Sequence, residues 1–284
     1  MVRIRAPAKV NLGLRVLGQR KDGYHLIDTV IVPVSLYDEI EITKPKGKRA
    51  KKAKLTVTCD HPVVPSGEKN LAYRAASLLL REKKVTTPIH VHIRKRIPVG
   101  GGLGGGSSDA AATLKGLNRL LRLSCRREEL LSLAASLGAD VPFFIDGRPA
   151  RARGIGERLK PLRSLPRLWM VILYPGFSVS TRWVYANLKL TKVIEDTSIN
   201  FSLRDFESIQ RVLVNELERV TLGRYPEVGL LKERLVREGA AAALMSGSGS
   251  SVFGIFLQRQ SARKAFDRLR KDKGFETFFV RSLT

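Results

Sequence analysis

The sequence predicts an α+β fold divided into two domains, and three observations lead to this prediction. The chain has 284 residues, of which 43% are hydrophobic, enough for one large or two ordinary globular domains. Two helix-like segments follow each other near the middle without a strand between them, which excludes a doubly wound arrangement there. Two strand-like segments near the end are joined by a short loop, and such strands pair antiparallel.

The elements of the first predicted domain, residues 1–160, follow from hydrophobic periodicity. Ile89, Val91 and Ile93 alternate with polar residues, which is the period of a half-buried strand. Similar patterns predict strands at 2–6, 12–16, 28–34, 39–43, 55–58 and 89–96. Apolar residues at helical spacing predict helices at 69–81 and 110–121, and a third helix from Glu128 that ends before Gly138.

The second predicted domain, residues 161–284, begins at a hinge. Prolines at both ends of residues 161–166 interrupt regular structure there. Beyond the hinge we expect strands at 169–174, 240–245, 252–257 and 276–280, and helices at 181–187, 206–220, 227–238 and 262–271. Helices mixed with an antiparallel strand pair make this half α+β.

Composition and cysteine usage narrow the class of protein. No apolar run approaches the length of a membrane span, and the N-terminal residues lack the apolar core of a signal peptide, so we expect a cytoplasmic protein. Cys59 and Cys125 are isolated and match no metal-binding or redox spacing, which suits a reducing compartment. His90 and His92 share one strand face without a nearby carboxylate, so no metal site is predicted.

The strongly basic charge keeps nucleic-acid binding open as an alternative function. The chain carries 51 lysines and arginines against 26 acidic residues, a formal net charge of +25, and residues 44–54 include seven basic residues. Against this alternative, the basic residues are spread over the whole chain, and the run contains no aromatic residue that could stack on a base. We interpret the run as a solvated hairpin tip, and the charge would also attract nucleotides.

The glycine-rich segment at residues 98–109 is the strongest functional signal. It holds six glycines and two serines between the strand at 89–96 and the helix at 110–121. Glycines let the backbone curl so that N–H groups converge, and the helix start adds unpaired N–H groups and the positive end of its dipole. The segment therefore predicts a phosphate-binding loop.

Two familiar nucleotide-binding patterns do not describe this segment. A Walker loop needs a lysine after its last glycine, where this chain has Gly106 and Ser107. Gly100, Gly102 and Gly105 match a dinucleotide pattern, but no strand ending in an acidic residue follows at the required distance.

A second segment of small residues lies at 246–251, between two predicted strands. A hairpin turn needs far fewer small residues than this segment has. We therefore expect a close approach to another backbone or to a ligand there, with a flexible turn as the alternative.

Three motifs together resemble the small-molecule kinase superfamily of galactokinase, homoserine kinase, mevalonate kinase and phosphomevalonate kinase. They are Pro-Ala-Lys-Val-Asn at residues 7–11, the glycine-rich segment, and Met-Ser-Gly-Ser-Gly at residues 245–249. Residues 22–25, residues 137–144 and the extra glycines of the central segment narrow the resemblance to the 4-diphosphocytidyl-2-C-methyl-D-erythritol kinase family. The resemblance implies a ribosomal-protein-like N-terminal domain, a ferredoxin-like C-terminal domain and ligands in the cleft between them.

The resemblance also implies the reaction. ATP, carrying Mg²⁺ with it, would phosphorylate the 2-hydroxyl group of 4-diphosphocytidyl-2-C-methyl-D-erythritol, giving the 2-phosphate and ADP in the non-mevalonate isoprenoid pathway. A sister kinase with another small alcohol acceptor is a second alternative. We expect a monomer or weak homodimer whose partners are these small molecules rather than nucleic acid or a membrane.

Two residues are expected to act in catalysis. Transfer to a hydroxyl group needs a carboxylate that accepts or orients its proton, and Asp140 resembles the family's base. A turn cap before Pro142 is the alternative role for Asp140. Lys9 lies in an apolar, strand-like run where an ammonium group needs an anionic partner, and it resembles the family's catalytic lysine. A surface position on an edge strand is the alternative for Lys9.

The remaining site residues are also expected from the resemblance. Those expected to contact ATP are Pro98, Gly100, Gly101, Gly102, Leu103, Gly104, Gly105, Gly106, Ser107, Ser108, Lys95, Asn70 and Leu71. Those expected to contact the acceptor are Asn11, Tyr24, His25, Arg148, Tyr185, Ser246 and Gly247. Among them, His25 is expected at the cytosine edge and Tyr185 is expected to stack on the ring. Asp109 stands where some members of the family have asparagine.

Overall fold

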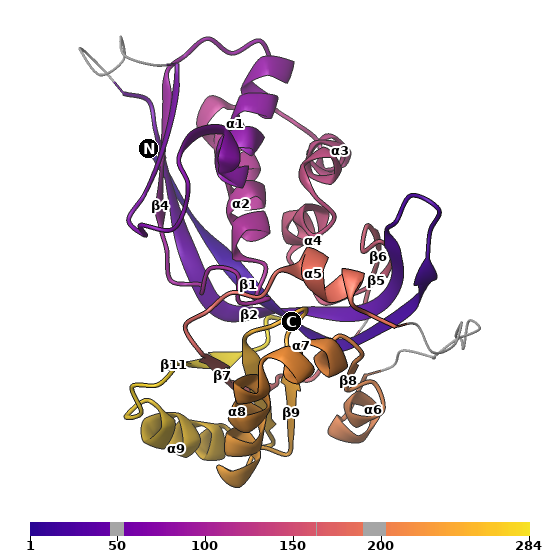
Figure 1. The fold of residues 1–284 in the computed structure, drawn as a ribbon. Coiled ribbons are helices and arrows are strands. Elements are labelled where there is room, and N and C mark those ends of the chain that lie inside the picture. The colour runs from indigo at the N-terminus through magenta and orange to yellow at the C-terminus, as the bar shows by residue number, and fades with distance from the viewer. Residues whose placement is uncertain (46–53, 163, 190–202) are drawn as a thin grey trace. The chain divides into compact units, whose positions relative to one another are not determined.

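The chain forms two compact units, and each unit is assembled from separate stretches of sequence (Figure 1). The computed structural model describes residues 1–45, 54–162, 164–189 and 203–284. Unit 1 contains residues 1–8, 36–99 and 104–147, and unit 2 contains residues 9–35, 100–103 and 148–284. The long strands β1 (Val2–Gln19) and β2 (His25–Thr43) contribute residues to both units. The domain boundary expected at residue 160 stays a prediction.

The sheet of unit 1 combines antiparallel and parallel pairing. Strand β4 (Ile89–Arg94) runs antiparallel to the end of β2, with Glu39 opposite Arg94. It runs parallel to β3 (Leu55–Cys59), and helix α1 (Leu71–Glu82) makes the crossover that parallel strands require. A 3₁₀ helix, η2 (Gly67–Lys69), precedes α1. The predicted alternation in β4 is confirmed, because Ile89, Val91 and Ile93 are all buried.

Three further helices complete unit 1. They are α2 (Gly105–Leu121), α3 (Arg127–Leu137) and α4 (Val141–Asp146), and α2 packs against α1, α3 and α4. Gly116 lets α2 lie close to the sheet, since a Cβ there would be 2.5 Å from Ile42 Cδ1. Helix α2 begins five residues earlier than predicted, at Gly105 rather than Ala110. Helix α4 was not predicted; Pro142 in its first turn suits a helix start.

In unit 2, short strands extend the pairing of β1 and β2. The first part of β2 pairs antiparallel with β5 (Ala150–Gly154), which pairs with β6 (Arg158–Pro161). Strand β1 pairs parallel with the short β8 (Val214–Asn215), with Gly13 opposite Val214. None of β5, β6 and β8 was predicted from the sequence.

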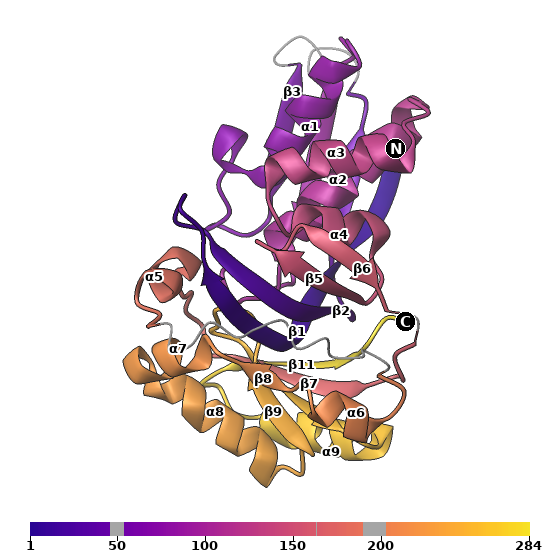
Figure 2. The same cartoon turned by 90° about the vertical axis from the view of Figure 1, so that its right-hand side faces the viewer.

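A second sheet in unit 2 confirms the ferredoxin-like expectation. Its strands are β7 (Trp169–Tyr174), β9 (Ala242–Met245), β10 (Val252–Phe256) and β11 (Glu276–Arg281). They pair antiparallel in the order β11-β7-β10-β9, and β9 and β10 pair as the short loop between them predicts. Helices α8 (Pro226–Arg237) and α9 (Arg259–Leu269) cover one face of this sheet (Figure 2).

The prediction of one helix at residues 206–220 is wrong. That stretch holds α6 (Phe206–Gln210), strand β8 and the start of α7 (Glu218–Arg224). Asn215 interrupts the helix, since its Nδ2 donates to Met245 O at 2.8 Å and to Gly247 O at 2.7 Å. The predicted helix at 181–187 is α5 (Thr181–Ala186), which the Ser180 side chain caps.

The first two strands are longer than predicted. The separate strands predicted at 2–6 and 12–16 are parts of one continuous strand, β1, and those predicted at 28–34 and 39–43 are parts of β2. Positions 46–53 of the basic run at 44–54 lie outside the described residues. In the parts of the chain that the structure describes, no helix combines the length and apolar character needed to cross a membrane.

Candidate active site

A buried chain of hydrogen bonds holds the Lys9 amino group in unit 2. Lys9 Nζ donates to Asn11 Oδ1 at 2.6 Å, and Asn11 Nδ2 donates to Thr29 Oγ1 at 2.8 Å. The Thr29 hydroxyl in turn donates to the Gly13 carbonyl at 2.6 Å. Lys9 is only 6% exposed, and β1 lies between β2 and β8, so the alternative of a surface lysine on an edge strand is wrong. A buried ammonium group is costly unless polar groups surround it, and this chain supplies them.

The small-residue segment at 246–251 approaches both Lys9 and the glycine-rich segment. A Cβ on Gly247 would lie 3.4 Å from Lys9 Nζ and 3.5 Å from Asn11 Oδ1. A Cβ on Gly102 would lie 2.1 Å from the Ser246 carbonyl oxygen, and Ser246 Oγ donates to the Gly102 carbonyl at 3.0 Å. The expected close approach to another backbone is therefore confirmed.

Replacement of Gly102 by alanine is expected to destabilise unit 2. Gly102 has φ +77°, a left-handed conformation, and the new Cβ would clash with the Ser246 backbone. Together these effects should lower the free energy of unfolding by roughly 2–4 kcal/mol. Urea denaturation measures this change, with Gly223→Ala as the matched control, since nothing lies within 4 Å of a Cβ at Gly223. Equal midpoints for the two variants would contradict the packing argument.

His25 and Tyr185 lie together in unit 2, and their contacts with the acceptor stay predictions. Their rings stack with centroids 5.0 Å apart and planes 30° apart. Burial lowers the pKa of His25, which favours the neutral ring with one donor and one acceptor nitrogen. Tyr24 is 60% exposed and Arg148 is also exposed, so neither is fixed by packing.

The later glycines of the glycine-rich segment form the start of helix α2 in unit 1. Gly104 is the N-cap residue with φ +70°, and the helix begins at Gly105. A Cβ on Gly105 would lie 2.9 Å from Lys95 Nζ and 3.1 Å from Ile97 Cγ2, so the backbone comes unusually close to the residues that follow β4. The first N–H groups of a 17-residue helix have no intrahelical partner and can bind phosphate oxygens.

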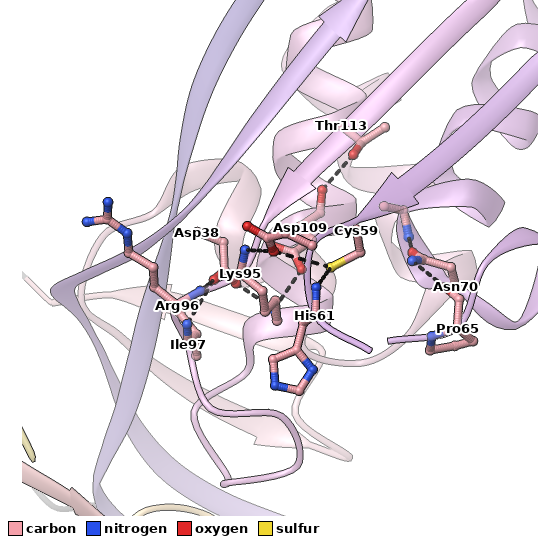
Figure 3. A network of polar contacts seen from close by, with 12 residues as sticks. Asp38, Cys59, His61, Pro65, Asn70, Lys95, Arg96, Ile97, Asp109 and Thr113 are labelled. Carbon is pink, nitrogen blue, oxygen red and sulfur yellow. Dashed lines mark hydrogen bonds and ion pairs between the residues drawn. The ribbon is translucent and has the colours of Figure 1, made fainter. Parts of the chain in front are cut away.

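A buried ion triad joins the two ends of this segment in unit 1 (Figure 3). Lys95 Nζ lies between two carboxyl groups, 2.5 Å from Asp38 Oδ2 and 2.8 Å from Asp109 Oδ2. Asp38 Oδ1 also accepts hydrogen bonds from the Arg96 and Ile97 N–H groups, at 2.6 and 2.8 Å. The triad therefore ties the residues before Pro98 to Asp109 in the second turn of α2.

The side chains of Lys95 and Asn70 also have structural roles. The Lys95 side chain is 4% exposed within the triad. Asn70 caps α1 by accepting the Ala72 N–H at 2.8 Å, and its Nδ2 donates to the Pro65 carbonyl at 2.9 Å. Leu71, the first residue of α1, is half-buried. Contacts of these residues with ATP stay predictions.

The triad predicts a pH-dependent contribution to stability. Burial, with the Asp38 carboxylate nearby, raises the pKa of Asp109 from 3.8 to about 8 although Lys95 opposes the shift. The native state then holds a proton that the unfolded chain has lost, so the free energy of unfolding should fall as the pH rises from about 4 to about 8. In Asp109→Asn this fall should be smaller, as measured by urea denaturation between pH 5 and 9. If the free energy of unfolding fell equally with pH in the original protein and in Asp109→Asn, Asp109 would not be the group responsible.

Asp140 lies in unit 1, in the turn between α3 and α4. It is the N-cap residue of α4, but its side chain makes no capping hydrogen bond. The alternative that Asp140 serves only to cap the turn before Pro142 is therefore not supported by the geometry. Gly138 ends α3 as predicted, with its N–H donating to the Ala134 carbonyl.

A resident metal site is not found among the described residues. Within those ranges no group of three or more histidine, cysteine or acidic residues could hold a metal ion. His90 and His92 instead share the Thr58 hydroxyl, at 3.0 and 2.9 Å.

Comparison with known proteins gives the family. The family model for the N-terminal domain of GHMP kinases matches residues 70–148, and the model for their C-terminal domain matches residues 199–274. A 4-diphosphocytidyl-2-C-methyl-D-erythritol kinase from Citrifermentans bemidjiense is 47% identical over 278 residues, 98% of each chain. The chain belongs to the GHMP kinase family. A relative of the same name from Geobacter sp. strain M21 is 48% identical to this GHMP kinase over 280 residues, again 98% of each chain.

Solved structures agree with the family. The crystal structure of a 4-(cytidine 5'-diphospho)-2C-methyl-D-erythritol kinase matches this GHMP kinase with a TM-score of 0.83 and 38% identity, covering 100% of both chains. The mevalonate kinase of Methanococcus jannaschii matches with a TM-score of 0.74 but only 13% identity, so it supports the fold alone. Membership makes this protein an ATP-dependent small-molecule kinase, which favours the kinase interpretation over nucleic-acid binding.

Sequence reasoning missed three residues that support the site of this kinase. Thr29 anchors Asn11, Asn215 holds the segment at 246–251, and Asp38 fixes the entry to the glycine-rich segment. Each is a buried polar residue in an apolar setting, which is the one signal that could have pointed to it.

Proposed function

We propose that this GHMP kinase transfers the γ-phosphoryl group of ATP to the 2-hydroxyl group of 4-diphosphocytidyl-2-C-methyl-D-erythritol. The products are the 2-phosphate and ADP. The observation that carries the proposal is the near-full-length similarity to relatives named for this acceptor, at 47% and 48% identity. The stacked pair of His25 and Tyr185 adds support, since an acceptor with a cytosine ring calls for an aromatic and hydrogen-bonding pocket.

In the proposed mechanism Asp140 acts as the base and Lys9 stabilises charge. Asp140 accepts the proton of the 2-hydroxyl group as its oxygen bonds to phosphorus and the bond from phosphorus to ADP breaks. Lys9 donates toward the moving phosphoryl group, where negative charge must be spread. The hydrogen bonds through Asn11 and Thr29 limit where the amino group can point, so it needs little reorganisation during the reaction.

The triphosphate of ATP is proposed to lie along the glycine-rich segment. The N–H groups at the start of α2, from Gly105 to Ser107, provide donors for phosphate oxygens. Ser108 supports this role, because its buried hydroxyl has no hydrogen-bond partner in the described structure. Since no dedicated metal cluster is found among the described residues, Mg²⁺ is proposed to enter as part of the ATP complex.

The direct test measures ADP release with ATP, magnesium and 4-diphosphocytidyl-2-C-methyl-D-erythritol. Mevalonate and homoserine serve as control acceptors. Turnover that depends on the cytidylyl acceptor supports the proposal. Turnover with a control acceptor alone would instead make the protein a sister kinase. No turnover by folded protein would reopen the nucleic-acid alternative, whose affinity for RNA should fall steeply with salt.

Replacement of His25 by alanine is expected to weaken binding of the acceptor rather than binding of ATP. Loss of the proposed hydrogen bond to the cytosine edge of the acceptor should raise the KM for the acceptor roughly 10- to 100-fold. The KM for ATP should stay within about twofold of the original value. Steady-state kinetics with each substrate varied in turn provides the measurement, with His92→Ala on β4 as the matched control. An equal rise in both KM values would contradict the pocket assignment.

The proposed assembly is a monomer or weak homodimer. Sedimentation velocity over a range of protein concentrations tests it, and a stable higher oligomer at the lowest concentration would contradict it.

A further inference from the structure

A basic hollow lies on the second sheet of unit 2, and it is lined by none of the residues assigned above to ATP or the acceptor. It has a volume of about 460 Å³, which falls within the usual range for small-molecule sites. Its lining consists of Ser35, Arg167, Trp169, Arg259, Phe279, Val280 and Arg281. We call this set the arginine hollow.

Strand register explains how these residues come together. In the antiparallel pair of β7 and β11, Trp169 lies opposite Arg281 and Val171 lies opposite Phe279. Residues that pair directly across two strands lie on the same face of the sheet, and so do residues two positions apart in one strand. Trp169, Phe279 and Arg281 therefore point to the same side. Arg167 precedes β7, and Arg259 begins helix α9, which packs on this face.

The aromatic rings and the arginines form a layered arrangement. The Trp169 and Phe279 rings stack with centroids 5.8 Å apart and planes 10° apart. The Arg259 guanidinium lies 5.5 Å above the Trp169 ring, and the Arg263 guanidinium lies 5.8 Å from the Phe279 ring. A guanidinium group stacked on a ring keeps its N–H groups at the edge, where they can bind an anion.

The lining residues of the arginine hollow include three arginines and no acidic residue. Among the residues that the structure describes, Arg167, Arg259 and Arg281 form no ion pair with a carboxylate, whereas Arg263 pairs with Asp267 at 2.9 Å. Three guanidinium groups around one concave site repel one another, and an anion in the site would relieve that repulsion. The fork of N–H groups on each arginine matches the oxygens of a phosphate group.

We propose that the arginine hollow binds a diphosphate group, either as free pyrophosphate or as part of a nucleoside diphosphate. Three arginines suit the two to three negative charges of such a group. A nucleic-acid strand fits less well, because bases need open aromatic faces and both rings here stack on each other and on arginines. The proposal does not depend on which acceptor the kinase uses.

Tryptophan fluorescence gives a local test. The chain has two tryptophans, so Trp183→Phe leaves Trp169 in the arginine hollow as the reporter. Titration of this protein with inorganic pyrophosphate should give a saturable change in emission. Adding Arg167→Gln and Arg281→Gln should weaken binding about tenfold or more, because two charge-assisted contacts are lost.

The matched control removes the same charge elsewhere. Arg211→Gln with Arg237→Gln changes two exposed arginines, one directly after α6 and one on α8, and it should leave the affinity for pyrophosphate within about twofold. Urea denaturation of both double variants checks that each is folded. Parallel titrations with ADP distinguish the sources: affinity about tenfold tighter for ADP assigns a nucleoside diphosphate, and equal affinity assigns the diphosphate group alone.

Three results would overturn the proposal. The first is no saturable change in emission at millimolar pyrophosphate. The second is equal affinity in the Arg167→Gln, Arg281→Gln variant and its parent. The third is tighter binding of a single-stranded oligonucleotide than of pyrophosphate, lost in the same variant and steeply weakened by salt, which would make the hollow a nucleic-acid surface.

Discussion

Replacement of Asp140 by asparagine is expected to lower kcat about 10²- to 10⁴-fold, the range for loss of a general base. Asparagine has nearly the same shape but cannot accept the proton of the hydroxyl group. The side chain of Asp140 makes no capping hydrogen bond to α4, so the change should leave the helix intact. Rapid-quench measurement of a single turnover, with a separate titration of ATP affinity, tests this expectation.

Asp146 supplies the matched control for that experiment. It lies at the other end of α4, where Arg127 binds its carboxylate with two hydrogen bonds of 2.7 and 2.6 Å. Asp146→Asn should therefore change stability slightly and leave kcat within about twofold, because exposed ion pairs contribute little. Turnover of Asp140→Asn at the rate of this control would remove Asp140 from the mechanism.

Replacement of Lys9 by alanine is the second large expected effect. Loss of a donor that stabilises transition-state charge should lower kcat about 10²- to 10³-fold. The value of kcat/KM should fall by the same factor, since the interaction is made mainly in the transition state. A rise in KM with unchanged kcat would mean that Lys9 only binds substrate.

Lys115 separates this effect from the general cost of removing a partly buried, hydrogen-bonded lysine. Its Nζ donates to the Phe144 carbonyl at 2.8 Å, and burial lowers its pKa. Lys115→Ala should reduce the free energy of unfolding by about 1–3 kcal/mol, because the carbonyl loses its donor. Its kcat for folded protein should stay near that of the original. A comparable loss of kcat in both variants would show that the Lys9 effect is structural.

The sequence predicts the elements whose partners are close along the chain. The bounds of β7 match the prediction at both ends, and the antiparallel pairing of β9 and β10 follows from their short connection. Helix α2 starts earlier than predicted because glycines are poor helix formers and favour a loop assignment, whereas here Gly105 fits a tight approach to Lys95. Asn215 breaks a helical pattern through contacts with residues 30 and 32 positions away, which periodicity cannot show.

In the candidate site, too, some features could be predicted from the sequence and others could not. The need of Lys9 for a partner could be predicted, because a lysine within an apolar strand must satisfy its charge. The expected partner was an anion, whereas the hydrogen bond described here goes to the amide oxygen of Asn11. The identity of Thr29 as the anchor could not, since it lies 18 positions beyond Asn11. The triad could not be predicted either, because Asp38 and Lys95 are 57 positions apart in the sequence and each alone resembles an ordinary surface charge. The arginine hollow depends on strand register, which a single sequence does not determine.

The interleaving of the two units has a consequence for synthesis on the ribosome. Unit 1 needs no residue beyond 147, whereas residues 33–35 of unit 2 bond to Arg281, Ser282 and Leu283. The Arg281 N–H and the Ser35 hydroxyl are 246 positions apart, a delay of roughly 10–50 s at ordinary elongation rates. All residues of unit 1 are therefore made while residues 9–35 of unit 2 still lack their C-terminal partners. That stretch includes Lys9, whose amino group lies close to Gly247, so the surroundings of the proposed catalytic lysine are completed only after residue 247 has been made.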